Sequence, residues 1–249
     1  NYLLPAGNLY IVNYTIYPSG AVNVAARFTS TDMDAAQTEV SEATRTATFT
    51  PGRDAARKEA SKLNVPRIGV RFRLPASMNQ GEYFGRGPAE NYLDRNAGSM
   101  IGLYKSTAEE LYFPYVRPQE NGHHTDTRWV SLSTGKKGLL IQADNTIGFN
   151  ALRNSIEDFD DEEATGLPRQ WSNFTPEQVA NHDEAAAKNV LRRQHHINDI
   201  TPRDFVEVCV DLKQQGVAGY DSWGSRPEPA YTLPANREYN WGFTLIPLK

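Results

Sequence analysis

Apolar and polar residues alternate along most of this chain, in short runs that are separated by glycine, proline or asparagine. Residues 8–17 and 21–29 alternate in this way around Pro18-Ser19-Gly20, which predicts a hairpin of two antiparallel strands. Comparable runs predict further strands at residues 67–74, 79–85, 127–133, 138–144, 147–152, 205–212 and 240–247. Many short strands with turns between them are typical of an all-β sandwich or barrel.

Two stretches interrupt the strand pattern. Residues 175–196 predict one substantial helix, because Thr175 can cap it, Pro176 suits its first position and Gln178 completes a capping box. Residues 32–64 are rich in Ala, Glu, Thr and Arg without a sustained apolar face, so we expect them to be exposed. No linker divides the chain, and we therefore expect a single domain over residues 1–249.

Composition and charge exclude several classes of protein. The chain has 249 residues, of which 39% are hydrophobic, enough for one large domain with a core. Its formal net charge of −4 argues against nucleic acid as a partner, because phosphate binding needs clustered Lys and Arg. No run approaches the roughly 18 apolar residues of a membrane span, so we expect no membrane partner. The start at Asn1 fits an excised fragment or a processed chain.

A glycine-rich turn follows the strand predicted at residues 205–212. It reads Gly216-Val217-Ala218-Gly219-Tyr220-Asp221-Ser222-Trp223-Gly224, and its glycines give the backbone access to positive φ angles. Trp223 at the tip of this turn has two interpretations. The indole can fold back over the sheet edge as an apolar plug, or it can face a ligand.

Two further blocks combine glycine, proline and charged residues. The first is Tyr83-Phe84-Gly85-Arg86-Gly87-Pro88-Ala89-Glu90-Asn91-Tyr92-Leu93-Asp94-Arg95, which by itself favours a structural turn held by internal ion pairs. The second is Pro114-Tyr115-Val116-Arg117-Pro118-Gln119-Glu120-Asn121-Gly122, followed by Thr127-Arg128-Trp129. With the glycine-rich turn, these blocks resemble three ordered motifs in the C-terminal domain of family-two β-galactosidases. Ala218 and Tyr220 replace a glycine and an aspartate of that family's usual turn.

The resemblance runs from about Asn8 to Leu248, with what look like insertions at residues 32–64 and 157–175. It implies a large antiparallel β-sandwich of the galactose-mutarotase kind, a unit that also occurs as the small subunit of split enzymes. Such enzymes are retaining glycosidases that cleave terminal β-galactosides with two carboxyl groups about 5 Å apart. The resemblance places both groups in a catalytic barrel domain or large subunit, which would be the partner of this chain. Trp223 and Asp221 would then line the sugar pocket, and we expect no catalytic residue here.

A polar cluster in the second block supplies further candidates. Carboxylate, amide, imidazole and guanidinium groups suit sugar hydroxyls, and the substrate-binding candidates are Glu120, Asn121, His124 and Arg128. The alternative is an ordinary structured loop, in which Arg128 pairs with Glu120 or Glu90. His123 and His124 are adjacent and point to opposite faces of a strand, so we expect neither a metal site nor another cofactor. Cys209 lies in the run at residues 205–212, which favours a buried thiol over a Cys–His nucleophile pair.

Two other functions compete with an accessory role in a β-galactosidase. A free-standing mutarotase would use His124 as an acid and Glu120 as a base on a sugar ring. A carbohydrate-binding module would need a row of exposed aromatic side chains. Only Trp223 has a clear ligand-facing interpretation, because Trp129, Trp171 and Trp241 fit better in the core or at a helix edge.

Overall fold

The computed structural model describes residues 8–29, 64–116, 118–159, 197, 200–221, 225–235 and 237–249. Within them, nine strands and two short 3-10 helices are formed. In chain order they are β1 (Leu9–Ile16), β2 (Val22–Thr29), β3 (Arg67–Pro75), β4 (Gln80–Gly87), β5 (Met100–Thr107), β6 (His124–Ser133), β7 (Gly138–Leu152), η1 (Ile156–Asp158), β8 (Phe205–Gln214), η5 (Pro229–Tyr231) and β9 (Tyr239–Leu248).

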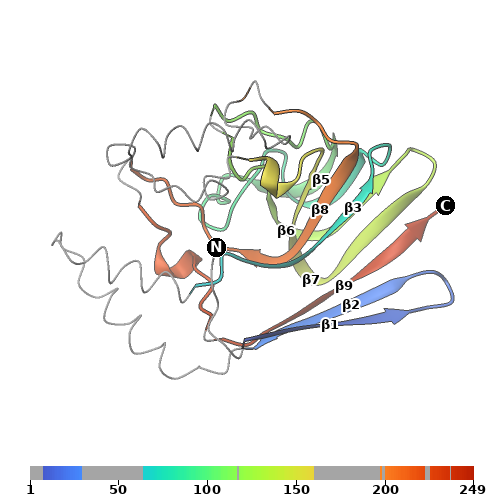
Figure 1. Cartoon of the computed structure of the whole chain (residues 1–249), viewed down its shortest axis with the longest axis horizontal. Coiled ribbons are helices and arrows are strands. Elements are labelled where there is room, and N and C mark those ends of the chain that lie inside the picture. The colour runs from blue at the N-terminus through green and yellow to red at the C-terminus, as the bar shows by residue number, and fades with distance from the viewer. Residues whose placement is uncertain are drawn as a thin grey trace, which may run out of the picture.

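The strands form one antiparallel sheet that divides at β7. The main path runs β1-β2-β9-β7-β6-β4-β5, while β8 leaves it by pairing with β7 and carries β3 on its other edge. β6 follows one edge of β7, and the other edge pairs first with β9 at Gly138–Ala143 and then with β8 at Gly148–Leu152. Figure 1 shows β1, β2 and β9 together on one side of β7, with β3 and β8 on the other.

The two branches of the sheet enclose a common apolar core. Val24 of β2 and Phe243 of β9 belong to the same buried cluster as Val208 of β8, so the branches face each other. The hydroxyl of Tyr10 on β1 donates a hydrogen bond to the Gly69 carbonyl of β3 at 3.2 Å, which ties the branches at one end. The predicted all-β sandwich class is therefore confirmed, with both layers drawn from one branched, open sheet.

Most of the predicted strands are confirmed, with two differences. The runs at residues 138–144 and 147–152 form one strand, β7, because the exposed residues between them lie where the partner changes from β9 to β8. The edge strand β5 was not predicted, since its apolar residues Met100, Ile101 and Leu103 are exposed and give no inward pattern. The predicted helix at residues 175–196 lies outside the described residues. So do all but a few residues of the two expected insertions.

Among the described residues, no helix has the length and apolar character needed to cross a bilayer.

Candidate functional site

The loop between β4 and β5 packs against the segment that leads into β6. The amide of Asn91 donates to the His123 carbonyl at 2.7 Å, and the amide of Thr125 donates to Asn91 Oδ1 at 2.9 Å. The amide of Gly122 donates to Glu90 Oε2 at 2.6 Å. These contacts join the first and second sequence blocks into one structural unit, although some 30 residues separate them along the chain.

Glu90 is the charged centre of this unit. Arg95 Nη2 donates to Glu90 Oε1 at 3.4 Å, and the hydroxyl of Tyr115 donates to the same oxygen. The guanidinium of Arg95 also lies over the Tyr92 ring, 5.1 Å from its centroid. The internal ion pair predicted for the first block is therefore confirmed, and it links two positions of the loop.

Asp94 connects the same loop to the glycine-rich turn. The amide of Val217 donates to Asp94 Oδ1 at 3.1 Å, and the amide of Ala218 donates to Oδ2 at 2.7 Å. The hydroxyl of Tyr220 donates to Oδ2 at 3.2 Å. All three sequence blocks thus converge on the loop at residues 88–96, which reaches the second block through Glu90 and the turn through Asp94.

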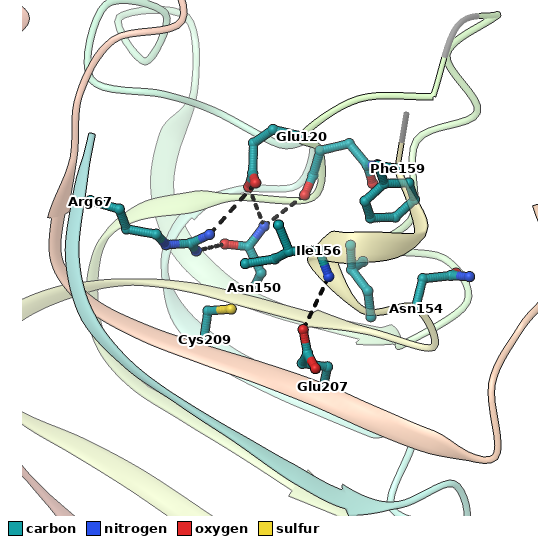
Figure 2. A pocket seen from close by; sticks show the side chains of 10 residues that line it. Arg67, Glu120, Asn150, Asn154, Ile156, Phe159, Glu207 and Cys209 are labelled. Carbon is teal, nitrogen blue, oxygen red and sulfur yellow. Dashed lines mark hydrogen bonds and ion pairs between the residues drawn. The ribbon is translucent and has the colours of Figure 1, made fainter. Parts of the chain in front are cut away.

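A small pocket with several polar residues in its lining lies next to these loops, against β3, β7 and β8 (Figure 2). Arg67 Nη2 donates to Asn150 Oδ1 at 2.5 Å and to Asp211 Oδ2 at 2.6 Å, while Nη1 lies 3.6 Å from Glu120 Oε2. Asn150 Nδ2 donates to Glu120 Oε1 at 3.1 Å and to the Asn121 carbonyl at 2.6 Å. The enclosed part of the pocket has room for about one water molecule, so a sugar ring does not fit inside it.

Strand geometry explains why these charges are buried. On β8, valines face the core, and the alternate residues Glu207, Cys209 and Asp211 point to the opposite face, where they are also buried. β3 lies alongside and places Gly69 opposite Asp211. A Cβ atom on Gly69 would lie 1.9 Å from Asp211 Oδ1, so the Asp211 carboxylate reaches Arg67 only across a glycine.

Burial sets the protonation of this cluster. It raises the pKa values of Glu120 and Asp211, and the nearby guanidinium of Arg67 opposes that rise. Burial also lowers the pKa of His123 to about 3, so this imidazole is neutral at ordinary pH. The pKa of the Cys209 thiol is raised to about 12 by burial, which keeps it protonated and supports the predicted structural thiol.

Two of the predicted substrate-binding residues lie in the interior. Asn121 is 2% exposed, and its side chain donates to the Gln119 carbonyl and accepts from the Phe113 amide. His124 is 1% exposed and packs between the rings of Tyr83 and Phe149. Its Nδ1 lies 3.0 Å from the Gly122 carbonyl and its Nε2 lies 3.3 Å from the Pro88 carbonyl. This environment argues against His124 as the acid of a mutarotase.

The other candidates are more accessible. Glu120 lines the pocket, and Asp221 is exposed on the turn, where it accepts from the Ser225 amide at 3.2 Å. Arg128 lies over the Phe84 ring and donates to the Asp126 carbonyl at 2.6 Å. The suggested pairing of Arg128 with Glu120 or Glu90 is wrong, because those carboxylates pair with Arg67 and Arg95. Trp223 lies outside the described residues.

Sequence reasoning missed several residues that the structure brings together. Arg67 and Asn150 carry no local signal, because the register of β3, β7 and β8 alone places them beside Glu120. Asp211 had a signal, since an ionisable residue in a strongly apolar run needs a partner when it is buried. Asp94 is part of the first block, but the sequence alone suggested no separate role for it. In the part of the chain that the structure describes, no three or more His, Cys, Asp or Glu side chains are grouped to hold a metal ion.

Comparison with known proteins gives a consistent result. The sequence matches the family described as "Beta galactosidase small chain" over residues 3–245. It is 35% identical to a β-galactosidase of Priestia megaterium over 185 residues, which is 74% of this chain and 15% of that protein. It is 25% identical to a β-galactosidase of Halalkalibacterium halodurans over 235 residues, which is 94% of this chain and 18% of that protein. The chain therefore spans less than a fifth of the length of these relatives.

Proposed function

The chain belongs to the β-galactosidase small-chain family, and from this membership we propose that it forms one wall of the sugar pocket in a β-galactosidase. The complete enzyme would be a retaining glycoside hydrolase that removes terminal β-galactosyl groups. Its catalytic carboxyl groups would come from a larger chain or domain, which is the partner of the small chain. The role of this chain is then to bind carbohydrate beside the reacting bond.

The observation that carries this proposal is the glycine-rich turn. Val217, Tyr220 and Asp221 are exposed on it, yet Asp94 holds the backbone at two successive amides. An exposed segment that is fixed by a dedicated carboxylate suits ligand contact, because a rigid contact loses little entropy on binding. Trp223 lies two positions after Asp221 in the sequence and would supply an indole face for the C–H groups of a sugar.

The polar candidates divide by accessibility. We propose that Asp221 and Glu120 accept hydrogen bonds from sugar hydroxyls, Glu120 from the rim of its pocket. Asn121 and His124, being buried, would act by holding the loop that carries Glu120. Arg128, cradled by Phe84 and the Asp126 carbonyl, would present its remaining N–H groups at the surface of the sheet.

The buried carboxylates argue against catalysis by this chain alone. Glu120 and Asp211 share Arg67, but Asp211 is 1% exposed and cannot reach a sugar. Glu207 is 3% exposed, and it accepts from Arg73 and from the Ile156 amide. A retaining mechanism needs two accessible carboxyl groups on opposite faces of the anomeric carbon. These residues do not meet that requirement.

The test is Trp223→Ala in the complete enzyme. An indole that covers about 60–100 Å² of sugar stabilises binding by roughly 1.5–2.5 kcal/mol, or about tenfold to seventyfold in affinity. Because the resemblance puts this turn on the leaving-group side, the KM for a disaccharide should rise more than the KM for an aryl galactoside. Transfer of galactose to added glucose should also weaken.

A matched control is Trp241→Ala, which removes an indole that stacks on Phe243 in the core. This control should lower the melting temperature without changing the ratio of the two KM values. If Trp223→Ala behaves like the control, the indole of Trp223 is a structural plug, and the proposed sugar contact is refuted.

A further inference from the structure

We infer that Asp94 is the positioning residue of the glycine-rich turn, and that its carboxylate sets the orientation in which the turn meets a sugar. This inference rests on the proposed function and extends it to a residue that does not itself touch the ligand. It also separates two roles within the first sequence block. Glu90 and Asn91 join that block to the second block, and Asp94 serves the turn.

The backbone of the turn shows how much depends on Asp94. Four successive amides at residues 215–218 each donate to an acceptor outside the turn. Gln215 donates to the Pro66 carbonyl at 2.9 Å and Gly216 donates to the Tyr231 carbonyl at 2.8 Å. The next two amides donate to the two carboxylate oxygens of Asp94, at 3.1 and 2.7 Å. None of the described strands pairs with residues 215–218, so the Asp94 carboxylate accepts the hydrogen bonds of two of these amides where the sheet ends.

The conformation of the turn needs such an anchor. Ala218 has a φ of 55° and Gly219 a φ of 79°, both in the left-handed region, where alanine is disfavoured. A Cβ atom on Gly216 would lie 2.5 Å from Asp94 Cγ, so the carboxylate sits directly on the backbone. Hydrogen bonds from amides to a carboxylate are stronger than neutral ones, and here they offset the strain at Ala218.

The position of Tyr220 adds a second consequence. Its side chain is 56% exposed, and its hydroxyl donates to Asp94 Oδ2 at 3.2 Å. The ring is therefore held at its distal end by the same carboxylate that holds the backbone. Asp94 thus holds both the backbone at Val217 and Ala218 and the exposed side chain of Tyr220.

The loop that carries Asp94 does not depend on this carboxylate. Asn91 and Glu90 already hold it against the second block, and Tyr92 is buried beneath it. Removing the charge should therefore loosen the turn while leaving the sheet and core intact. This separation makes the inference testable by substitution.

The experiment compares Asp94→Asn, Tyr220→Phe and the control Asp204→Asn in the complete enzyme. Asp204 is an exposed carboxylate directly before β8. Hydrogen–deuterium exchange is measured for peptides that contain residues 217 and 218, together with kcat and KM for a disaccharide and an aryl galactoside. An asparagine can accept at only one of the two atoms, so exchange at these amides should rise about tenfold or more in Asp94→Asn.

The KM for the disaccharide should rise about threefold to tenfold in Asp94→Asn, with a smaller change for the aryl galactoside. Tyr220→Phe removes one of the three contacts and should show a smaller increase in both readouts. The control should match the parent enzyme, and the melting temperatures of all variants should agree within a few degrees.

Two results overturn the inference in distinguishable ways. If the amides of Val217 and Ala218 stay protected in Asp94→Asn, Asp94 is not the anchor, whatever the kinetic constants are. If these amides open and neither KM changes, Asp94 anchors a turn that does not serve the substrate. That second result refutes the positioning role together with the proposed function of the turn.

Discussion

Arg67 is the side chain that Asp211 and Glu120 share beside the pocket. It lies 2.6 Å from Asp211 and 3.6 Å from Glu120, and it donates to Asn150, which in turn holds Glu120. A buried ion pair contributes little compared with well-packed apolar residues, because both charges lose their hydration. Removing one partner is different, since the remaining charge stays buried without compensation. Arg67 is therefore needed for stability once the two carboxylates are in place.

We predict that Arg67→Met lowers the free energy of unfolding by about 3–5 kcal/mol at pH 7, as measured by urea unfolding. The surface pair of Arg27 and Glu238, whose side chains are 54% and 41% exposed, provides the control. Arg27→Met should lower the free energy of unfolding by less than about 1 kcal/mol. If both variants lost the same free energy of unfolding, the conclusion that Arg67 compensates buried charges would be wrong.

The same variant has a defined pH dependence. The pKa values of Glu120 and Asp211 are already raised by burial, and Arg67 is the main influence that lowers them. Without Arg67 the native state holds protons on these carboxyls at higher pH than the unfolded state does. Its stability should then increase as the pH falls from 7 toward 5, so the difference from the parent protein should shrink.

This cluster also shows what sequence reasoning reaches at the scale of residues. Glu120 was predicted from its own motif. The other members of its cluster, Arg67, Asn150 and Asp211, come from three strands, and Arg67 and Asp211 are 144 positions apart in the chain. Their contact follows from the register of β3 on β8 and from the space above Gly69. Turn geometry sets the register of a hairpin, but no short turn joins β3 to β8, so the sequence gives no local signal for this register.

At the scale of elements, the strands of this sheet differ in how many partners they pair with and in how much they contribute to the buried core. β7 pairs with β6, β8 and β9, and its last six residues are all buried. β5 lies at the end of the sheet and pairs with β4 alone. β1 is also an edge strand with exposed apolar residues, but the Pro18-Ser19-Gly20 turn to β2 indicated a hairpin in the sequence. β5 follows β4 only after the loop at residues 88–99, so no short turn marks it as a strand.

The contrast between β7 and β5 predicts the outcome of two truncations. Phe149 of β7 is fully buried, with ring centroids 5.1 Å from both Tyr83 and His124. Phe149→Ala should lower the free energy of unfolding by about 3–5 kcal/mol. Leu103 of β5 is 60% exposed, and Leu103→Ala should change the free energy of unfolding by about 0.5 kcal/mol or less. Urea unfolding of both variants checks this prediction. A large loss of stability in Leu103→Ala would mean that the Leu103 side chain is buried by other residues.

At the scale of the whole molecule, two of the three edge strands of the described sheet, β1 and β5, have exposed apolar side chains. They include Tyr14 and Ile16 on β1 and Met100 and Leu103 on β5. Exposed edge strands favour association with other chains. The chain spans less than a fifth of the length of these relatives, which is consistent with the proposal that it works with a larger catalytic chain or domain. Activity measurements on the isolated chain should therefore include its oligomeric state, to separate self-association from assembly with the catalytic partner.

We predict that the isolated chain does not hydrolyse β-galactosides, and that activity appears when it is mixed with, or fused to, the catalytic barrel of the same enzyme. The reason is that the resemblance places both catalytic carboxyl groups in a separate barrel, while in the described part of this chain the carboxyls of Glu207 and Asp211 are buried and engaged by arginines. A chromogenic galactoside measures hydrolysis, and polarimetry of freshly dissolved galactose measures mutarotation. Hydrolysis by the highly purified chain would contradict the proposal that the catalytic carboxyl groups belong to a larger chain or domain. Mutarotation above the buffer rate would instead favour a free-standing epimerase, despite the buried position of His124.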